Sequence, residues 1–307
     1  MDFLRFLEGI RTPVATNIFS VLTYCGDELF FMVLAITVFW CISKRDGYYI
    51  LAVGFLGTVL NQFMKLWFRV PRPWVLDPSF TIVESARAAA GGYSFPSGHT
   101  QNIVGTMACV LLTTKRRAIR IAAVALMVLV PFSRMYLGCH TPLDVAVAFV
   151  LAWAIALALL PVFRRAEERP VLLDRLLLGM LLVMILYWLF ITFYPFPADV
   201  DPKNLYEGSK NAYTLLGCLV GLLIARYVDE RYIHFEVKAV WWAQVLKVLM
   251  GLMLLLIIKE GLKAPLLAVL PTFPATAIRY CLMVVFAGAV WPLTFHWFSR
   301  LGRRGAN

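Results

Sequence analysis

The sequence predicts an all-α protein, a polytopic transmembrane helical bundle. Of its 307 residues, 61% are hydrophobic and 15% are charged, and the mean hydropathy is +0.76. A soluble domain of this length needs more polar surface than such a composition supplies. Apolar runs also recur at the length of about 20 residues that crosses about 30 Å of hydrocarbon. No internal repeat or low-complexity tract is visible, so we expect a single bundle.

The order along the chain starts with residues 1–27, which we expect to lie on the outer face as an interfacial segment. About nine apolar runs with the length of membrane spans follow. Their approximate bounds are 28–43, 48–65, 99–114, 119–136, 142–163, 174–194, 210–228, 239–258 and 276–298. The first and third runs are short for a span.

The distribution of lysine and arginine predicts the orientation of these spans. If Lys44 and Arg45 are placed in the cytoplasm, five short cytoplasmic segments hold 16 of the 29 basic residues. The outer segments and span edges hold 12, so the arrangement follows the positive-inside rule. The N-terminus is then outside and the C-terminus is cytoplasmic. The net charge of +11 is thus mainly a signal of topology, and we expect no nucleic-acid partner.

Three segments on the predicted outer side carry the residues suited to chemistry. They are KLWFRVPRP (65–73) after the second span, PSGH (96–99) at the start of the third, and SRMYLGCHTPLD (133–144) between the fourth and fifth. Lys65, Arg72 and Arg134 place three cations at one membrane depth, with few acids beside them. Uncompensated cations near a bilayer mark functional sites, and lysine and arginine donors suit a phosphate group.

The PSGH segment predicts an anion site at a helix N-terminus. Ser97 is a suitable N-cap, and we expect the helix to begin near His99. Free backbone N–H groups at this end can bind an anion, and Gly98 permits close approach. His99 would then project from the first turn toward the bound group.

The third segment predicts an oriented nucleophile. Pro142 suits the first turn of a helix, and His140 and Asp144, four residues apart, can meet on one face. A carboxylate that accepts one ring N–H fixes the tautomer and makes the other nitrogen more basic. We therefore expect His140 to attack phosphorus and His99 to protonate the departing oxygen.

Together these segments resemble the three motifs of the type 2 phosphatidic acid phosphatase superfamily, with every motif position filled over residues 65–144. The resemblance implies a phosphohistidine on His140, Asp144 as its orienting group and His99 as the general acid. It also implies that the phosphoryl oxygens are held by Lys65, Arg72, Ser97, Gly98 and Arg134. Neither a metal nor another cofactor is needed by this family.

The resulting prediction is an integral membrane phosphatase of the plasma or inner membrane, with its site on the extracytoplasmic or lumenal face. Residues 28–163 would form a catalytic core of five spans, and residues 164–307 a scaffold of four spans in the same bundle. A lipid substrate is favoured because the site lies at the bilayer surface. The candidates are a prenyl diphosphate, phosphatidic acid, phosphatidylglycerophosphate and a sphingoid phosphate.

Three alternatives remain open at this point. The nine-span layout is similar to that of the glucose-6-phosphatase and sphingosine-phosphate phosphatase branches, so a sugar phosphate is a second substrate class. A lipid phosphotransferase would use the same site with an acceptor other than water. A non-catalytic lipid-phosphate transporter or binder is the third. Membrane lipids are the other expected partners, and a homo-oligomer stays open.

Overall fold

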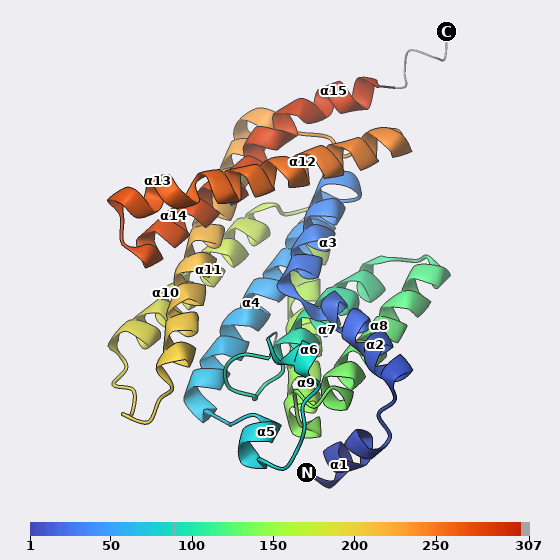
Figure 1. The fold of residues 1–307 in the computed structure, drawn as a ribbon. Helices are drawn as coiled ribbons and strands as arrows, with labels where there is room; N and C mark the ends of the chain where they lie inside the picture. The colour runs from blue at the N-terminus through green and yellow to red at the C-terminus, as the bar shows by residue number, and fades with distance from the viewer. Residues whose placement is uncertain (89, 302–307) are drawn as a thin grey trace. The chain divides into compact units, whose positions relative to one another are not determined.

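A computed structural model describes residues 1–88 and 90–301 of the chain. Every regular element in this part is a helix, and none of the described residues forms a β-strand (Figure 1). The predicted all-α class is therefore confirmed. What remains is to explain how these helices bring the three polar segments together.

The helices follow one another with short connections in both halves of the chain. The first half contains α1 (Asp2–Gly9), α2 (Pro13–Leu22), η1 (Thr23–Gly26), α3 (Glu28–Cys41), α4 (Lys44–Phe68), α5 (Pro73–Leu76), α6 (Glu84–Arg87), α7 (Gly98–Thr113), α8 (Arg117–Tyr136) and α9 (Pro142–Arg165). The second half contains α10 (Val171–Phe193), α11 (Pro202–Val228), η2 (Asp229–Ile233), α12 (Trp241–Gly261), α13 (Lys263–Val269), α14 (Thr272–Val285), η3 (Phe286–Val290), η4 (Trp291–Thr294) and α15 (Phe295–Arg300).

The described chain has seven helical segments long and apolar enough to cross a membrane, and eight if one bent pair counts as a span. The bent pair joins Pro13–Gly26 to Glu28–Cys41 at an angle of 52°. The chain is therefore a multi-pass integral membrane protein. The predicted runs 28–43 and 99–114 correspond to α3 and α7, which have only 14 and 16 residues. At 1.5 Å per residue neither helix alone reaches about 30 Å, so the count of nine stays a prediction.

Two compact units make up the structure, and each combines segments that are distant in the sequence. The first unit comprises residues 1–32, 49–161 and 196–208. The second comprises residues 33–48, 162–195 and the chain from Ser209 onward. All three polar segments identified in the sequence lie in the first unit.

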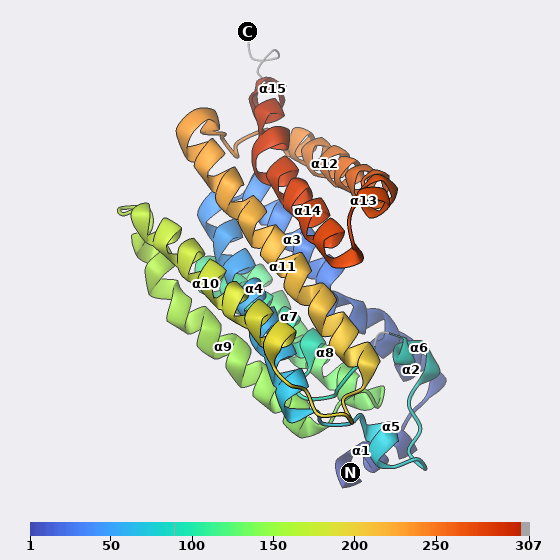
Figure 2. The same ribbon diagram turned by 90° about the vertical axis from the view of Figure 1, so that its left-hand side faces the viewer.

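In the first unit, α7 and α8 pack as a helical hairpin, and α2 and η1 lie against them (Figures 1 and 2). Small residues allow neighbouring helices to approach closely. A Cβ atom added at Gly105 of α7 would lie 3.1 Å from Val53 of α4 and 3.9 Å from Ala152 of α9. Because successive helices reverse direction, the C-terminal ends of α4 and α8 and the N-terminal ends of α7 and α9 meet at one end of this unit.

The N-terminal segment 1–27 also packs into the first unit. The Phe19 ring lies 5.3 Å from the Phe132 ring and 4.7 Å from the Tyr136 ring, measured between centroids. The Tyr136 hydroxyl accepts a hydrogen bond of 3.0 Å from the backbone N–H of Thr12. These contacts attach the segment to α8, while its position at the membrane interface stays a prediction.

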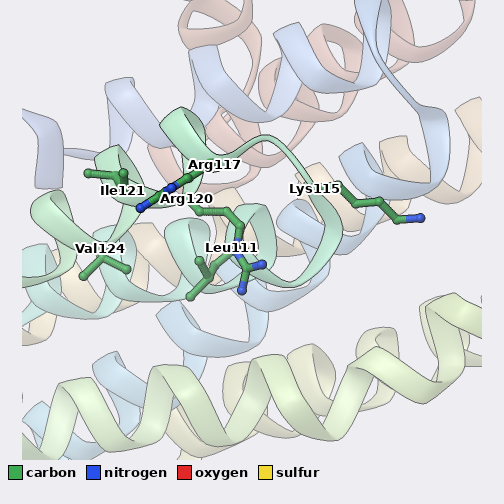
Figure 3. Close-up of a pocket in the computed structure, with 6 residues that line it drawn as sticks. All are labelled: Leu111, Lys115, Arg117, Arg120, Ile121 and Val124. Carbon is green, nitrogen blue, oxygen red and sulfur yellow. The ribbon is translucent and has the colours of Figure 1, made fainter.

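A hollow of about 610 Å³ opens at the opposite end of the α7–α8 hairpin from the polar segments (Figure 3). Its lining residues are Leu111, Lys115, Arg117, Arg120, Ile121 and Val124. Three of them are basic: Lys115 lies in the connection between α7 and α8, and Arg117 and Arg120 lie at the start of α8. The positive-inside pattern assigns this end of the hairpin to the cytoplasm. This hollow is separate from the candidate site, because residues 97–99 and 133–134 lie at the other ends of the same two helices.

In the second unit, two glycines bring α11 close to the backbone of α14. A methyl group on Gly217 would overlap the carbonyl oxygen of Ala277, and one on Gly221 would lie 2.6 Å from the carbonyl oxygen of Cys281. Glycines four residues apart share one helix face, and this spacing is typical of close helix pairs in membranes.

The second unit also buries a lysine among carbonyl oxygens and an aromatic ring. The Lys247 ammonium donates to the carbonyl oxygens of Trp40, at 2.8 Å, and Val237, at 3.2 Å. It lies 4.3 Å from the centroid of the Phe295 ring. These contacts satisfy a cation that the sequence places inside a span, and they attach the end of α3 to α12.

The close approach of α11 and α14 predicts a stability difference between two glycine substitutions. Gly217→Ala is expected to destabilise the protein by about 1–3 kcal/mol, because the new methyl group meets backbone that cannot rotate away. The measurement is the midpoint of thermal unfolding in detergent, followed by circular dichroism. The matched control is Gly179→Ala in α10, where an added Cβ atom meets nothing within 4 Å. Equal midpoints for the two variants would contradict the close contact.

Candidate active site

The PSGH segment forms the predicted cap at the start of α7. Ser97 is the N-cap residue, and its side-chain oxygen accepts from the backbone N–H of Thr100 at 3.4 Å. The backbone N–H of Ser97 donates to the carbonyl oxygen of Asp144 at 3.1 Å, which ties this segment to the start of α9. Both predicted helix starts are confirmed, since α7 begins at Gly98 and α9 at Pro142.

The short turn between α8 and α9 places His140 beside Arg134. Gly138 has a φ angle of +84°, a conformation that favours glycine, and it reverses the chain after α8. The backbone N–H groups of Cys139 and His140 then donate to the carbonyl oxygen of Arg134 at 2.9 and 3.3 Å. His140 is buried, with 1% of its surface exposed.

The two ring nitrogens of His140 differ in their nearest neighbours, although Nη1 of Arg72 lies within 3.4 Å of both. Nδ1 lies 3.5 Å from Oδ2 of Asp144 and 3.4 Å from Oγ of Ser94. Nε2 lies 2.9 Å from Nη1 of Arg72, which is a donor only. The arrangement therefore favours the tautomer that carries its proton on Nδ1 and keeps the lone pair on Nε2.

The structure brings His140 and Asp144 together, but the carboxylate is held mainly by other donors. Oδ2 of Asp144 accepts from Oγ of Ser94 at 2.5 Å and from the backbone N–H of Thr141 at 2.8 Å. The distance of 3.5 Å to His140 is longer than a good hydrogen bond. Ser94, which is fully buried, is thus a site residue that the sequence analysis missed. A single serine two residues before PSGH carries no spacing signal of its own.

The Arg72 guanidinium contacts His140 and also donates to the backbone of two loops, one before α7 and one between α8 and α9. Its Nε and Nη2 donate to the carbonyl oxygens of Gly92 and Gly91 at 2.8 and 2.7 Å. Its Nη1 donates to the carbonyl oxygen of Cys139 at 3.0 Å as well as facing the imidazole. Arg72 therefore positions the loop before α7 against the α8–α9 turn, in addition to contacting the imidazole of His140.

The Arg134 side chain has donors that the protein does not use. It is completely buried, and its Nη1 donates to the hydroxyl of Thr23 at 2.8 Å. In the part of the chain that the structure describes, its Nε and Nη2 have no hydrogen-bond partner. Burying unpaired charged donors is costly, and an anion is the kind of partner that would satisfy them.

The positive charges converge on His140. Burial lowers the pKa of the His140 imidazole well below its ordinary value, and the charges of Arg72, Arg134 and Lys65, together with His99, lower it further. The imidazole is therefore uncharged at neutral pH, and the lone pair on its Nε2 faces Nη1 of Arg72. Lys65 lies in the last turn of α4 and is partly buried.

Gly98 and His99 occupy the first turn of α7 as predicted. A Cβ atom added at Gly98 would meet only Oδ1 of Asn61, at 3.8 Å, so the glycine leaves open space at the helix N-terminus. Nε2 of His99 lies 2.7 Å from Oδ1 of Asp27. Asp27 and Thr23 were also missed by the sequence analysis, because they belong to the N-terminal segment, far from the motifs.

Comparison with known families matches two parts of the chain. Residues 46–168 match the PAP2 superfamily, and residues 213–304 match the PAP2 superfamily phosphatase transmembrane extension. The first of these matches contains all three motifs. It begins after Thr23 and Asp27.

Several characterised proteins are similar to this chain. A probable sphingosine-1-phosphate phosphatase from Dictyostelium discoideum is 28% identical over 239 residues, which are 74% of this chain and 57% of that protein. Phosphatidylglycerophosphatase B from Bacillus subtilis is 30% identical over 46% of this chain and 72% of its own length. The undecaprenyl-diphosphatase BcrC of the same bacterium is 32% identical over 36% of this chain and 54% of its own length. No solved structure matches the chain.

The family matches and one of the relatives identify the family of this chain. The two family matches lie in different parts of the chain and name the same superfamily. One relative is 30% identical over 72% of its own length. The resemblance seen in the three motifs is thereby confirmed, and the chain belongs to the PAP2 superfamily.

Proposed function

We propose that this protein hydrolyses the phosphate monoester or diphosphate of a lipid through a phosphohistidine on His140. One observation carries the proposal. The buried imidazole has its Nδ1 toward Ser94 and Asp144 and its Nε2 toward the Arg72 guanidinium. Beside it, Arg134 keeps two buried donors without a partner in the described residues. A nucleophile and an anion-binding group thus lie next to each other.

In the first step, Nε2 of His140 attacks phosphorus, and the bond between phosphorus and the substrate's leaving oxygen breaks. His99 transfers a proton to that oxygen, so the lipid leaves as an alcohol from a monoester, or as the lipid monophosphate from a diphosphate. Asp144 and Ser94 hold the Nδ1 side of the ring as positive charge develops on it.

In the second step, water attacks the phosphohistidine. His99, now neutral, accepts a proton from the water, the phosphorus–nitrogen bond breaks, and inorganic phosphate leaves. In both steps the equatorial oxygens carry the negative charge of the transition state, and Lys65, Arg72 and Arg134 stabilise it. The backbone at Ser97 and Gly98 supplies further N–H donors.

Lipid substrates are supported by the names of three relatives. Their names are probable sphingosine-1-phosphate phosphatase, phosphatidylglycerophosphatase B and undecaprenyl-diphosphatase, so a phosphorylated lipid is common to the names while the lipid differs. For this chain we propose the same substrate class.

We place the site on the extracytoplasmic or lumenal face, with the N-terminus on that face and nine spans in total. Residues 28–163 would be the catalytic core, residues 164–307 its scaffold, and residues 1–27 an interfacial segment.

The nucleophile is tested by His140→Ala. We expect the rate of phosphate release to fall by about 10⁴-fold or more, because the covalent route is lost. Wild-type protein quenched during turnover should carry an acid-labile phosphate that the variant lacks. His296→Ala is the control, since that exposed histidine of α15 lies outside the site. Full activity in His140→Ala would remove the proposed mechanism.

The substrate class is tested by phosphate release from a panel of lipid phosphates, lipid diphosphates and glucose 6-phosphate. At least one lipid is expected to be hydrolysed faster than the sugar, because the site lies at a bilayer surface. A preference for glucose 6-phosphate would indicate a sugar phosphatase. Turnover only with an added alcohol acceptor would indicate a phosphotransferase, and binding without turnover a transporter or binder.

Metal independence is tested by the same assay with and without EDTA. Phosphate release is expected to stay within about twofold of its original rate, because three cationic side chains take the electrostatic role that a metal ion has in other phosphatases. The proposal fails if EDTA abolishes activity and a divalent cation restores it.

A further inference from the structure

The turn before α3 reaches the candidate site from outside the segment that matches the PAP2 superfamily. That match begins at residue 46, whereas the turn comprises Thr23–Gly26 and the following Asp27. We propose that this turn completes the active site, with Asp27 as a positioning residue for His99. The inference rests on the proposed function, because it assigns a partner to the general acid.

The first observation is the contact between the two side chains. Oδ1 of Asp27 lies 2.7 Å from Nε2 of His99, and the two side chains are 31% and 14% exposed. Nε2 is buried and has no well-aligned hydrogen-bond partner among the described residues. The two side chains are therefore in close contact, without a well-aligned hydrogen bond between them. Catalytic hydrogen bonds commonly tighten only when substrate binds.

The second observation is that the turn is fixed to α7 around this contact. A Cβ atom added at Gly26 would lie 2.8 Å from Cβ of His99 and 3.1 Å from Cγ1 of Val130. The Asn102 side chain donates to the carbonyl oxygen of Gly26 at 3.3 Å. The glycine thus permits the backbone of the turn to lie directly against the histidine, and Asn102 holds it there.

A third contact joins the same turn to the phosphate-binding side of the site. The hydroxyl of Thr23, a residue that is 5% exposed, accepts from Nη1 of Arg134 at 2.8 Å. One turn of five residues therefore contacts both the general acid and a proposed phosphate ligand. A segment that only shielded the site from solvent would not need polar contacts with both His99 and Arg134.

The chemistry of the proposed reaction explains a carboxylate at this position. With the proton on Nε2 held toward Asp27, Nδ1 is the nitrogen that donates to the leaving oxygen. After that transfer the proton on Nε2 remains, so Nδ1 is free to accept a proton from water in the second step. Arg134 and Lys65 place positive charge near His99, and Asp27 is the carboxylate in contact that offsets it. The site would then contain two histidine–carboxylate pairs.

The test uses the dependence of the rate on the leaving group. An alkyl alcohol needs a proton to leave, whereas 4-nitrophenol is acidic enough to leave as an anion. Asp27→Ala is expected to lower kcat for the best lipid monoester by about 10²-fold, and kcat for 4-nitrophenyl phosphate by less than about threefold. Asp27→Asn keeps the shape and one oxygen acceptor, so an intermediate loss is expected. His99→Ala should show the same selectivity with a larger loss.

The matched control is Asp2→Asn, which removes an exposed carboxylate from the same N-terminal segment and should change neither rate. Folding of each variant is checked by its unfolding midpoint, and the isosteric Asp27→Asn carries the comparison if Asp27→Ala does not fold. An equal loss on both substrates, or wild-type rates in Asp27→Asn and Asp27→Ala, would overturn the inference while leaving the phosphatase intact. If the wild type hydrolyses neither substrate, the proposed function itself has failed.

Discussion

The organisation of the first unit depends on a buried, uncharged imidazole placed among positive charges. His140 is held by its backbone contact with Arg134, and its ring lies between a carboxylate with a serine on one side and a guanidinium on the other. Within the described residues Arg134 keeps buried donors unpaired, and burying such donors is costly. The phosphate group of the proposed substrate would supply acceptors for them. The same groups would then stabilise the charge of the transition state without having to reorient.

This arrangement follows from helix direction and from small residues at helix contacts. Each motif lies at a helix end, so alternating helices deliver all three to one end of the unit. Gly105 lets α4, α7 and α9 approach closely enough for that end to be shared. Arg72 then joins the loop before α7 to the α8–α9 turn through backbone carbonyls. Its role is therefore structural as well as electrostatic.

The sequence predicted the features that have a local signal. Ser97 and Pro142 begin helices for reasons that a few neighbouring residues contain, and motif spacing identified the family. Ser94, Thr23 and Asp27 have no such signal, because each acts through a partner at least 46 residues away. The number of membrane spans could not be predicted from the sequence for a similar reason. Hydropathy located the apolar runs, but the ends of α3 and α7 depend on turns that only the folded chain defines.

The attachment of the N-terminal segment has a consequence for how the boundaries of this protein are drawn. A shortened chain that starts at residue 46 would retain every motif residue and would still match its superfamily. It would nevertheless lack the hydroxyl that accepts from Arg134, the carboxylate beside His99 and the glycine that packs against that histidine. The region recognised by similarity is therefore shorter than the region that supplies side chains to the proposed active site.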